Sequence, residues 1–215
     1  MMSMTARFVK SAAGVLLLLA VVPMLVSYWA PTPKSPPLVN GRGVVLDAET
    51  QAALIEIVFD AARSDDLTTV TEYLKEGFSP NVRSPRGDTL LTVAAYHDSG
   101  DVVEKLLVQP NIDVEARNRM GLTAVAAAAF KGHERPLHML IAAGADVNSS
   151  NGMNQTVLMF ASLSGRTKVV EILMASGADR DRSDKLGNTA VSVARTQGAD
   201  DVVRVLSKDS MKEFR

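Results

Sequence analysis

The chain has 215 residues, a formal net charge of −1 at pH 7, three histidines and no cysteine. The absence of cysteine excludes disulfide bonds, thiol catalysis and zinc sites with thiolate ligands. A charge this close to zero gives the whole chain no general attraction for nucleic acid. The length suits one folded domain and one additional segment.

The additional segment lies at the N-terminus. Residues 1–10 contain Arg7 and Lys10, whereas residues 11–33 contain no charged side chain. As a helix, an apolar stretch of this length would span about 30 Å, which is the thickness of the hydrocarbon core of a bilayer. We therefore expect a transmembrane anchor at residues 11–30, preceded by a cytoplasmic tail at residues 1–10.

Two interpretations of this segment stay open, a retained anchor and a cleaved signal peptide. A cleavage site needs small residues in an A-x-A-like pattern, but Ala30 comes after Tyr28 and Trp29 and before Pro31. The aromatic pair fits the interfacial belt of a membrane helix. We expect a single-pass protein of the inner (plasma) membrane with the rest of the chain exported to the periplasm. If the segment is cleaved, the product is periplasmic or secreted.

Residues 31–46 follow the anchor and are rich in proline and glycine. Proline stiffens the backbone and removes a hydrogen-bond donor, while glycine disfavours ordered structure, so this composition is typical of spacers. We expect an extended stalk that joins the anchor to the folded domain.

The rest of the chain is internally repeated. Four threonines follow one another at intervals of 34, 33 and 33 residues, and an alanine stands five residues after each of them. These threonines are Thr89, Thr123, Thr156 and Thr189. Each opens a short apolar stretch and fits the N-cap position of a helix, and a second apolar stretch follows it. Helices this short bury their apolar faces only by stacking on the next copy.

Two segments carry a resemblance to a known family. Residues 165–179 read Gly-Arg-Thr-Lys-Val-Val-Glu-Ile-Leu-Met-Ala-Ser-Gly-Ala-Asp, and residues 140–148 read Leu-Ile-Ala-Ala-Gly-Ala-Asp-Val-Asn. They resemble the second helix and closing turn of an ankyrin repeat. The resemblance implies an all-α ankyrin-repeat helical solenoid with short β-turn fingers at residues 47–209. It divides into about five repeats and a tail, near residues 47–86, 87–120, 121–153, 154–186, 187–209 and 210–215.

The chain departs from the family signature T-P-L-H-x-A at the proline and the histidine. The proline is replaced by Leu90, Ala124, Val157 and Ala190, and the histidine by Thr92, Ala126, Met159 and Ser192. In the family this histidine ties neighbouring loops together by hydrogen bonds. We therefore expect an array that is less stable than a consensus one.

Catalytic and metal chemistry find little support in the sequence. His97 ends a first helix, His133 occupies the Gly-His turn position of the family, and His138 falls on a second helix. These positions do not have metal-ligand spacing on one helix face. No nucleophile motif, phosphate loop or dinucleotide fingerprint is present. We expect no catalytic, metal or cofactor site and no small-molecule substrate.

By resemblance, a protein partner binds the concave face of the array. That face takes the two residues after the alanine pair of each first helix, together with the variable finger residues. Singly, each apolar side chain there is as well suited to packing as to binding. The candidate partner-binding residues are Tyr96, His97, Phe130, Lys131, Leu163 and Ser164 at the helix ends, and Arg86, Arg119, Met120, Leu122, Met153 and Leu186 in the fingers.

The fingers are locally basic. Their arginines include Arg83, Arg117, Arg180 and Arg182, but Glu115, Asp181 and Asp184 are interleaved with them. We expect no nucleic-acid partner. The sequence as a whole predicts a non-catalytic protein–protein interaction module held at the membrane by residues 11–30. The alternatives are an immunity-type inhibitor of a secreted toxin and an accessory partner of an exported stress-defence enzyme such as catalase. An enzyme on a repeat scaffold would require a deep polar pocket.

Overall fold

The computed structural model describes residues 37–208, which form five helical hairpins. In each hairpin a first helix is followed by a short turn and a second helix. The hairpins are α3 (Ala48–Ser64) with α4 (Leu67–Lys75), α5 (Leu90–Tyr96) with α6 (Gly100–Leu107), α7 (Ala124–Lys131) with α8 (Glu134–Ala142), α9 (Val157–Leu163) with α10 (Thr167–Ala175), and α11 (Ala190–Gln197) with α12 (Asp200–Lys208).

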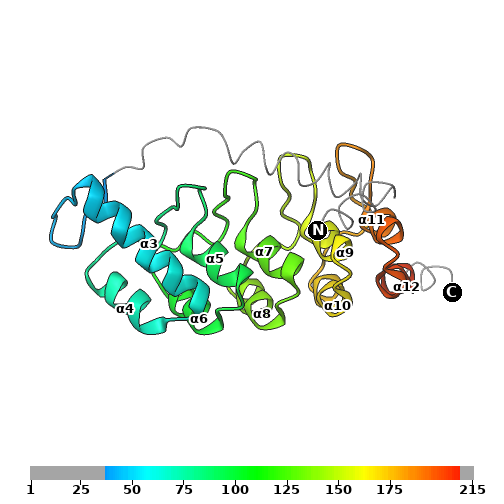
Figure 1. The fold of residues 1–215 in the computed structure, drawn as a ribbon. Helices are drawn as coiled ribbons and strands as arrows, with labels where there is room; N and C mark the ends of the chain where they lie inside the picture. The colour runs from blue at the N-terminus through cyan, green and yellow to red at the C-terminus, as the bar shows by residue number, and fades with distance from the viewer. Residues whose placement is uncertain (1–36, 209–215) are drawn as a thin grey trace, which may run out of the picture.

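The hairpins stack side by side into an elongated array with two rows of helices (Figure 1). The first helices form one row and the second helices form the other, and each helix packs against its own partner and its neighbours in the row. Loops project from the row of first helices, away from the second helices (Figure 1). The predicted all-helical solenoid is thereby confirmed.

The four repeat threonines cap the first helices as predicted. Each side-chain oxygen accepts a hydrogen bond from the backbone amide three residues further on. In two repeats the residue that replaces the family histidine returns a bond to the cap. Met159 Sδ accepts from the Thr156 amide at 3.4 Å, and Ser192 Oγ accepts from the Thr189 amide at 2.9 Å. These reciprocal bonds satisfy backbone donors that a helix start leaves open.

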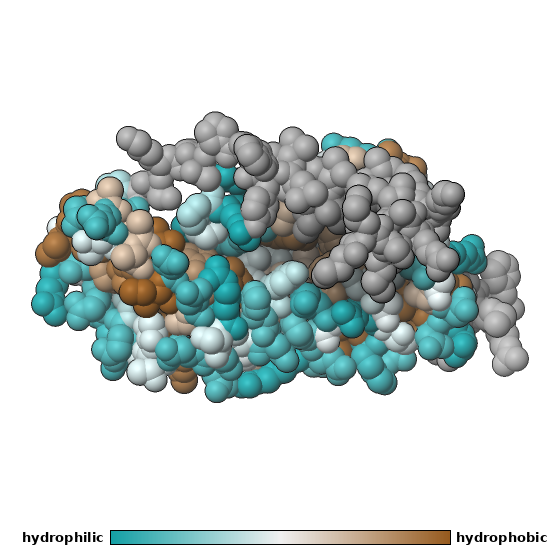
Figure 2. Space-filling view, viewed as in Figure 1, coloured by the Kyte–Doolittle hydropathy of each residue, from teal (hydrophilic) through white to brown (hydrophobic). Residues whose placement is uncertain are grey.

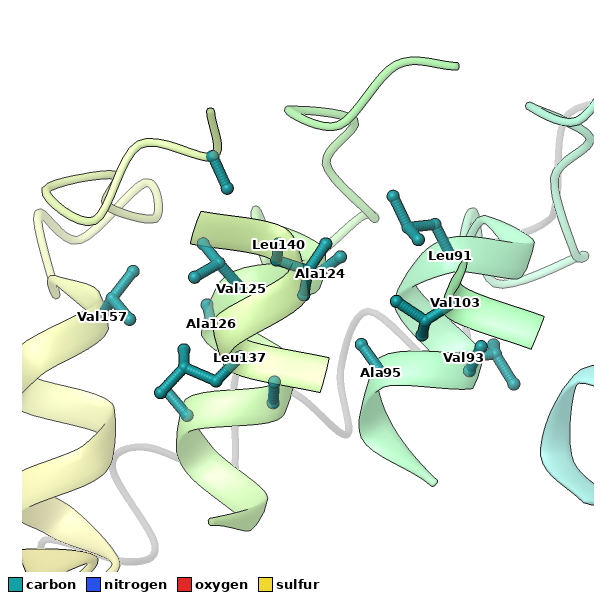
Figure 3. Close-up of a cluster of buried hydrophobic side chains, with 14 of the residues drawn as sticks. Leu91, Val93, Ala95, Val103, Ala124, Val125, Ala126, Leu137, Leu140 and Val157 are labelled. Atoms are coloured by element: carbon teal, nitrogen blue, oxygen red, sulfur yellow. The ribbon is translucent and has the colours of Figure 1, made fainter. Parts of the chain in front are cut away.

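The core lies between the two rows and between successive hairpins. Small side chains of the first helices, such as Ala95 and Ala126, allow close approach, and larger side chains of the second helices fill the remaining space (Figure 3). Leu137 and Leu140 of α8 have no exposed surface. Because every hairpin supplies only part of this core, burial depends on the stack.

The fingers are held by their own arginines. Arg83 Nη1 donates to the carbonyl of Gly87 in its own finger at 2.9 Å and to that of Arg117 in the next at 2.7 Å. Arg117 repeats the pattern with the carbonyls of Gly121 and Ser150. Two of the arginines that make the fingers basic therefore join one finger to the next.

A second ladder of side chains links the closing turns of successive repeats. Asn81 Oδ1 accepts from the Asp113 amide at 2.9 Å, and Asn148 Oδ1 accepts from the Asp179 amide at 2.8 Å. Glu115 occupies the corresponding place in the repeat between them and accepts from the Asp146 amide at 2.8 Å. Glu115 is thus part of the framework rather than an isolated acidic residue.

Residues 37–46 do not form the extended stalk that we expected for this part of the 31–46 segment. Val39 and Val45 form an antiparallel bridge, and the Leu38 amide donates to Gln51 Oε1 on α3 at 3.0 Å. The Gly41 amide also donates to the carbonyl of Glu76 at 2.8 Å. The glycines allow a tight turn and close approach, so they permit packing here rather than preventing it.

Close approach explains two of these glycines. A Cβ atom added to Gly77 would collide with the Cα of Gly41, and Gly77 has a φ of +79°. The hairpin of residues 37–46 therefore lies directly on the end of α4. Hydrophobic residues gather at the surface over α3, while the second helices present a mainly hydrophilic surface (Figure 2).

The predicted anchor at residues 11–30, the tails at 1–10 and 210–215, and the start of the predicted stalk lie outside the described residues. Within residues 37–208, no helix is long and apolar enough to span a membrane.

Candidate functional site

The predicted helix-end residues occupy equivalent places in three successive repeats. Tyr96 and Leu163 are the last residues of α5 and α9, with His97 and Ser164 as their C-caps, while Phe130 and Lys131 end α7. Tyr96 is 37% exposed, whereas Phe130 and Leu163 are half-buried. We call these six residues, together with the exposed finger residues Arg86, Arg119, Met153, Lys185 and Leu186, the candidate face.

Tyr96 and Lys131 come together across the boundary between two repeats. The ammonium nitrogen of Lys131 lies 5.0 Å from the centroid of the Tyr96 ring. This distance is within the range of a cation–π interaction, which orients both side chains. Both residues were predicted to lie on the binding face, but the sequence alone offers no basis for pairing them.

Phe130 is shared between the candidate face and the packing of the next repeat. Its ring meets that of Phe160 on α9 edge to face, with centroids 6.4 Å apart and an interplanar angle of 88°. Phe160 itself packs against the hydrophobic core. Phe130 therefore offers a partner only part of its ring, and its other part stabilises the stack.

The finger residues divide in the same way. Met153 is 42% exposed and Leu186 66% exposed, so both offer apolar surface to solvent. Arg86 and Arg119 are exposed as well. Met120 and Leu122 are half-buried, and Leu122 packs against the core. Of the apolar finger candidates, Met153 and Leu186 have the surface that a partner could reach.

The backbone beneath the candidate face is fixed by the following repeat. His133 Nε2 donates to the carbonyl of Tyr96 at 3.1 Å, and Arg166 Nε donates to the carbonyl of Phe130 at 3.4 Å. His133 thus serves as the structural turn histidine that the sequence predicted. In the first repeat, Asp65 holds the next hairpin by accepting from the Val102 amide at 3.0 Å.

Basic side chains of the two neighbouring repeats lie near His97. The pKa of His97 is lowered from its ordinary value, first by partial burial and then by repulsion from Arg63, Lys131 and His133. Repulsion of this kind requires that each of these three groups lies near His97. The only acidic neighbour of Arg63 among the ion pairs of the described residues is Asp60 on the same helix.

The described residues contain no group of three or more His, Asp or Glu side chains placed to hold a metal ion. A shallow hollow of about 750 Å³ lies between α6 and α8, where Leu107, Val108 and Met139 line it with Arg135 and His138. It is formed by the second helices and is separate from the candidate face.

A protein family described as "Ankyrin repeats (3 copies)" matches residues 58–151 and residues 137–213 of the chain. A Pseudomonas aeruginosa ankyrin repeat protein is 40% identical over 58 residues, which are 27% of this chain and 33% of that protein. An ankyrin repeat domain-containing protein of Stachybotrys chartarum is 31% identical over 98 residues, which are 46% of this chain and 5% of that protein.

The chain thus spans a third or less of the length of these relatives. The family match covers most of the five hairpins, and it agrees with the threonine caps, the paired rows of helices and the projecting fingers. Ankyrin repeats in general serve as protein–protein interaction modules without catalytic machinery. The chain belongs to the ankyrin-repeat family.

Proposed function

We propose that the chain is a non-catalytic module that binds a protein partner on its candidate face. The observation that carries this proposal is the exposed apolar surface of Tyr96, Met153 and Leu186, which come from three different repeats. Partly exposed aromatic and apolar side chains flanked by charged groups are typical of binding hot spots. The face is held in place from behind by cross-repeat hydrogen bonds, so a partner meets a preorganised surface.

The proposal includes a location. The uncharged stretch at residues 11–33 supports a membrane anchor at 11–30, with the repeat domain on the periplasmic side of an inner membrane. A reporter fused after Arg215 is then active outside the cytoplasm, and the chain stays in the membrane fraction after alkaline washing. Recovery of a soluble form that begins near Pro31 would identify a cleaved signal, and a reporter active only in the cytoplasm would reverse the orientation.

The binding proposal is tested by site-specific photo-cross-linking in the native host. The full chain carries p-benzoylphenylalanine in place of Tyr96, and a matched chain carries it in place of Lys168, an exposed residue of α10. We expect one discrete adduct from position 96 in the membrane fraction and none from position 168. Equal adducts from both positions, or no adduct from position 96, would contradict the proposed face.

The identity of the adduct also separates the two specific roles. An exported enzyme such as a catalase in the adduct supports the role of accessory partner. A secreted toxin that is inhibited by the purified chain supports the role of immunity-type inhibitor.

A further inference from the structure

The polar groups of the candidate face are almost all hydrogen-bond donors. Lys131, Arg119 and Lys185 are cationic, His97 lies near Arg63 and Lys131, and the Tyr96 hydroxyl can also donate. Donors of this kind are matched by acceptor-rich groups with negative charge. The face therefore differs from the chain as a whole, whose net charge is only −1.

The acidic side chains on this side of the array are already engaged. Asp60 forms an ion pair with Arg63 on its own helix. Asp88 is half-buried and accepts from Asn118 Nδ2 at 2.8 Å, and Asp184 is buried and accepts from Leu186 and Asn188 amides. Asp98 is exposed beside His97 and lies 3.8 Å from His133 Nδ1. By contrast, no ion pair within the described residues engages Lys131, Arg119 or Lys185, so these three cations are open to an acidic partner.

Most of the remaining acidic residues lie elsewhere in the repeats. Asp101, Glu104, Glu134 and Glu171 are exposed on the second helices, and Asp113, Asp146 and Asp179 are exposed in the closing turns. The second helices carry cations as well, but these are paired locally. Lys75 pairs with Glu72, Arg135 with Asp101 and Glu104, and Lys168 with Glu171. The two sides of the array therefore differ in how their cations are paired. Cations without an ion-pair partner attract carboxylates more strongly than paired ones, which favours approach of an acidic partner on the side of the fingers and first-helix ends.

The apolar neighbours of these cations restrict the class of partner. Tyr96, Met153 and Leu186 are exposed between the charged groups, and Met and Leu offer no flat ring on which a base could stack. A single-stranded nucleic acid needs successive stacking platforms as well as positive charge. A protein segment with alternating carboxylate and apolar side chains matches both features of the face.

We infer that the candidate face binds an acidic protein segment, whose carboxylates meet Lys131, Arg119 and Lys185 and whose apolar side chains meet Tyr96, Met153 and Leu186. The inference rests on the proposed protein-binding function and adds the chemistry of the partner. The paired Tyr96 and Lys131 form its centre, because the ring positions the ammonium group at a junction between repeats.

The test uses the full chain in a nonionic detergent and three labelled peptides of about 12 residues, which span about 40 Å when fully extended. The peptides share their Leu and Tyr positions and carry Glu, Gln or Lys at all other positions. Fluorescence anisotropy then gives the affinity at several salt concentrations. We expect the Glu peptide to bind at least about tenfold more tightly than the Gln peptide, with an affinity that falls as salt rises.

Variants locate the binding. Lys131→Gln combined with Arg119→Gln should lower the affinity for the Glu peptide by about threefold to tenfold. The affinity for the Gln peptide should stay the same. The control is Lys168→Gln combined with Lys75→Gln, which removes two exposed charges from the second helices. It should leave both affinities as they are. Equal losses in the two double variants would show general attraction rather than a site.

The remaining outcomes separate this inference from the proposed function. Equal affinity for the Glu and Gln peptides, together with a specific adduct from position 96, would overturn the acidic partner and leave protein binding intact. No adduct from position 96 and no peptide binding would overturn both. If an oligothymidine competes for the face at lower concentration than the Glu peptide, the partner is a nucleic acid and the inference is wrong.

Discussion

Arg83 reaches from one finger to the next and donates from Nη1 to the backbone carbonyl of Arg117 at 2.7 Å. Arg117 in turn donates to the carbonyls of Gly121 and Ser150. Arg117→Ala removes two charge-assisted bonds, so we expect a loss of about 1–2 kcal/mol in the free energy of unfolding. Chemical denaturation followed by circular dichroism measures it.

The control for this change is two residues away. Arg119 is exposed on the same finger and belongs to the candidate face, so Arg119→Ala should change the free energy of unfolding by no more than about 0.5 kcal/mol. Similar losses for the two variants would show that the finger arginines share one role, contrary to the structure.

The core of α8 provides a second prediction. Leu140 is completely buried between two hairpins, so Leu140→Ala should cost about 2–5 kcal/mol through lost burial and the cavity left behind. Lys168 is exposed and forms a surface ion pair with Glu171, so Lys168→Ala should stay within about 0.5 kcal/mol. The two variants are compared by their denaturant midpoints, with the slope of the free energy of unfolding against denaturant held constant. Equal losses of stability would contradict the predicted register of the repeats.

The contact between Gly41 and Gly77 leads to a third prediction. Gly77→Ala introduces backbone strain at a φ of +79° and a collision with Gly41. Gly144 follows Ala143, the C-cap of α8, with a φ of +87°, and an added Cβ there meets nothing within 4 Å. We expect Gly144→Ala to cost about 1 kcal/mol from strain alone and Gly77→Ala to cost more.

Hydrogen exchange distinguishes the two causes. In Gly77→Ala the Gly41 amide, which donates to Glu76, should lose its protection, whereas in Gly144→Ala it should keep it. Retained protection in Gly77→Ala would mean that the hairpin of residues 37–46 is not held by this contact.

Stability should depend on pH through His97. Its pKa in the folded protein is below the ordinary value of 6.5, so the unfolded chain takes up a proton at a higher pH than the folded chain does. Stability is then complete above pH 6.5 and falls as the pH drops through the pKa of the folded protein. The pH values 7.5 and 5 flank the ordinary pKa of histidine. Between them, the melting temperature of His97→Gln should decrease less than that of the unaltered protein. An unchanged pH dependence in that variant would show that other groups dominate.

The two aromatic residues of the candidate face should respond differently to truncation. Tyr96 is 37% exposed, so Tyr96→Ala should weaken the partner complex by about 1–4 kcal/mol with little change in melting temperature. Phe130→Ala also removes the edge-to-face contact with Phe160, which costs about 0.5–1.5 kcal/mol of stability. Titration calorimetry and thermal melting measure the two effects. A large drop in melting temperature for Tyr96→Ala would place its ring in the core.

The helices and their caps could be predicted because their causes are local. A threonine caps the amide three residues ahead, and the same spacing recurs in four repeats, so one pattern gave the starts of α5, α7, α9 and α11. The burial of Leu140 followed in the same way from its place in the repeat. The family match confirms that these repeats are ankyrin repeats.

Features that depend on contacts between distant residues could not be predicted. Composition alone suggested a stalk at residues 31–46, but the fold of residues 37–46 depends on Gln51 and Gly77 in other elements. The pairing of Tyr96 with Lys131 and of Phe130 with Phe160 likewise requires the offset between neighbouring first helices. Position in the repeat indicated which side chains lie at the surface. It did not indicate how much of each side chain is buried by its neighbours.

Tyr96 offers its ring to solvent while its carbonyl accepts from His133 of the next repeat. A partner that pulls on the ring therefore pulls on the joint between two repeats. Since each described hairpin packs mainly against the hairpins beside it, small rotations between successive repeats add up along the array. The repeat array should consequently be elastic, and a partner that contacts several repeats at once should set its curvature in the complex.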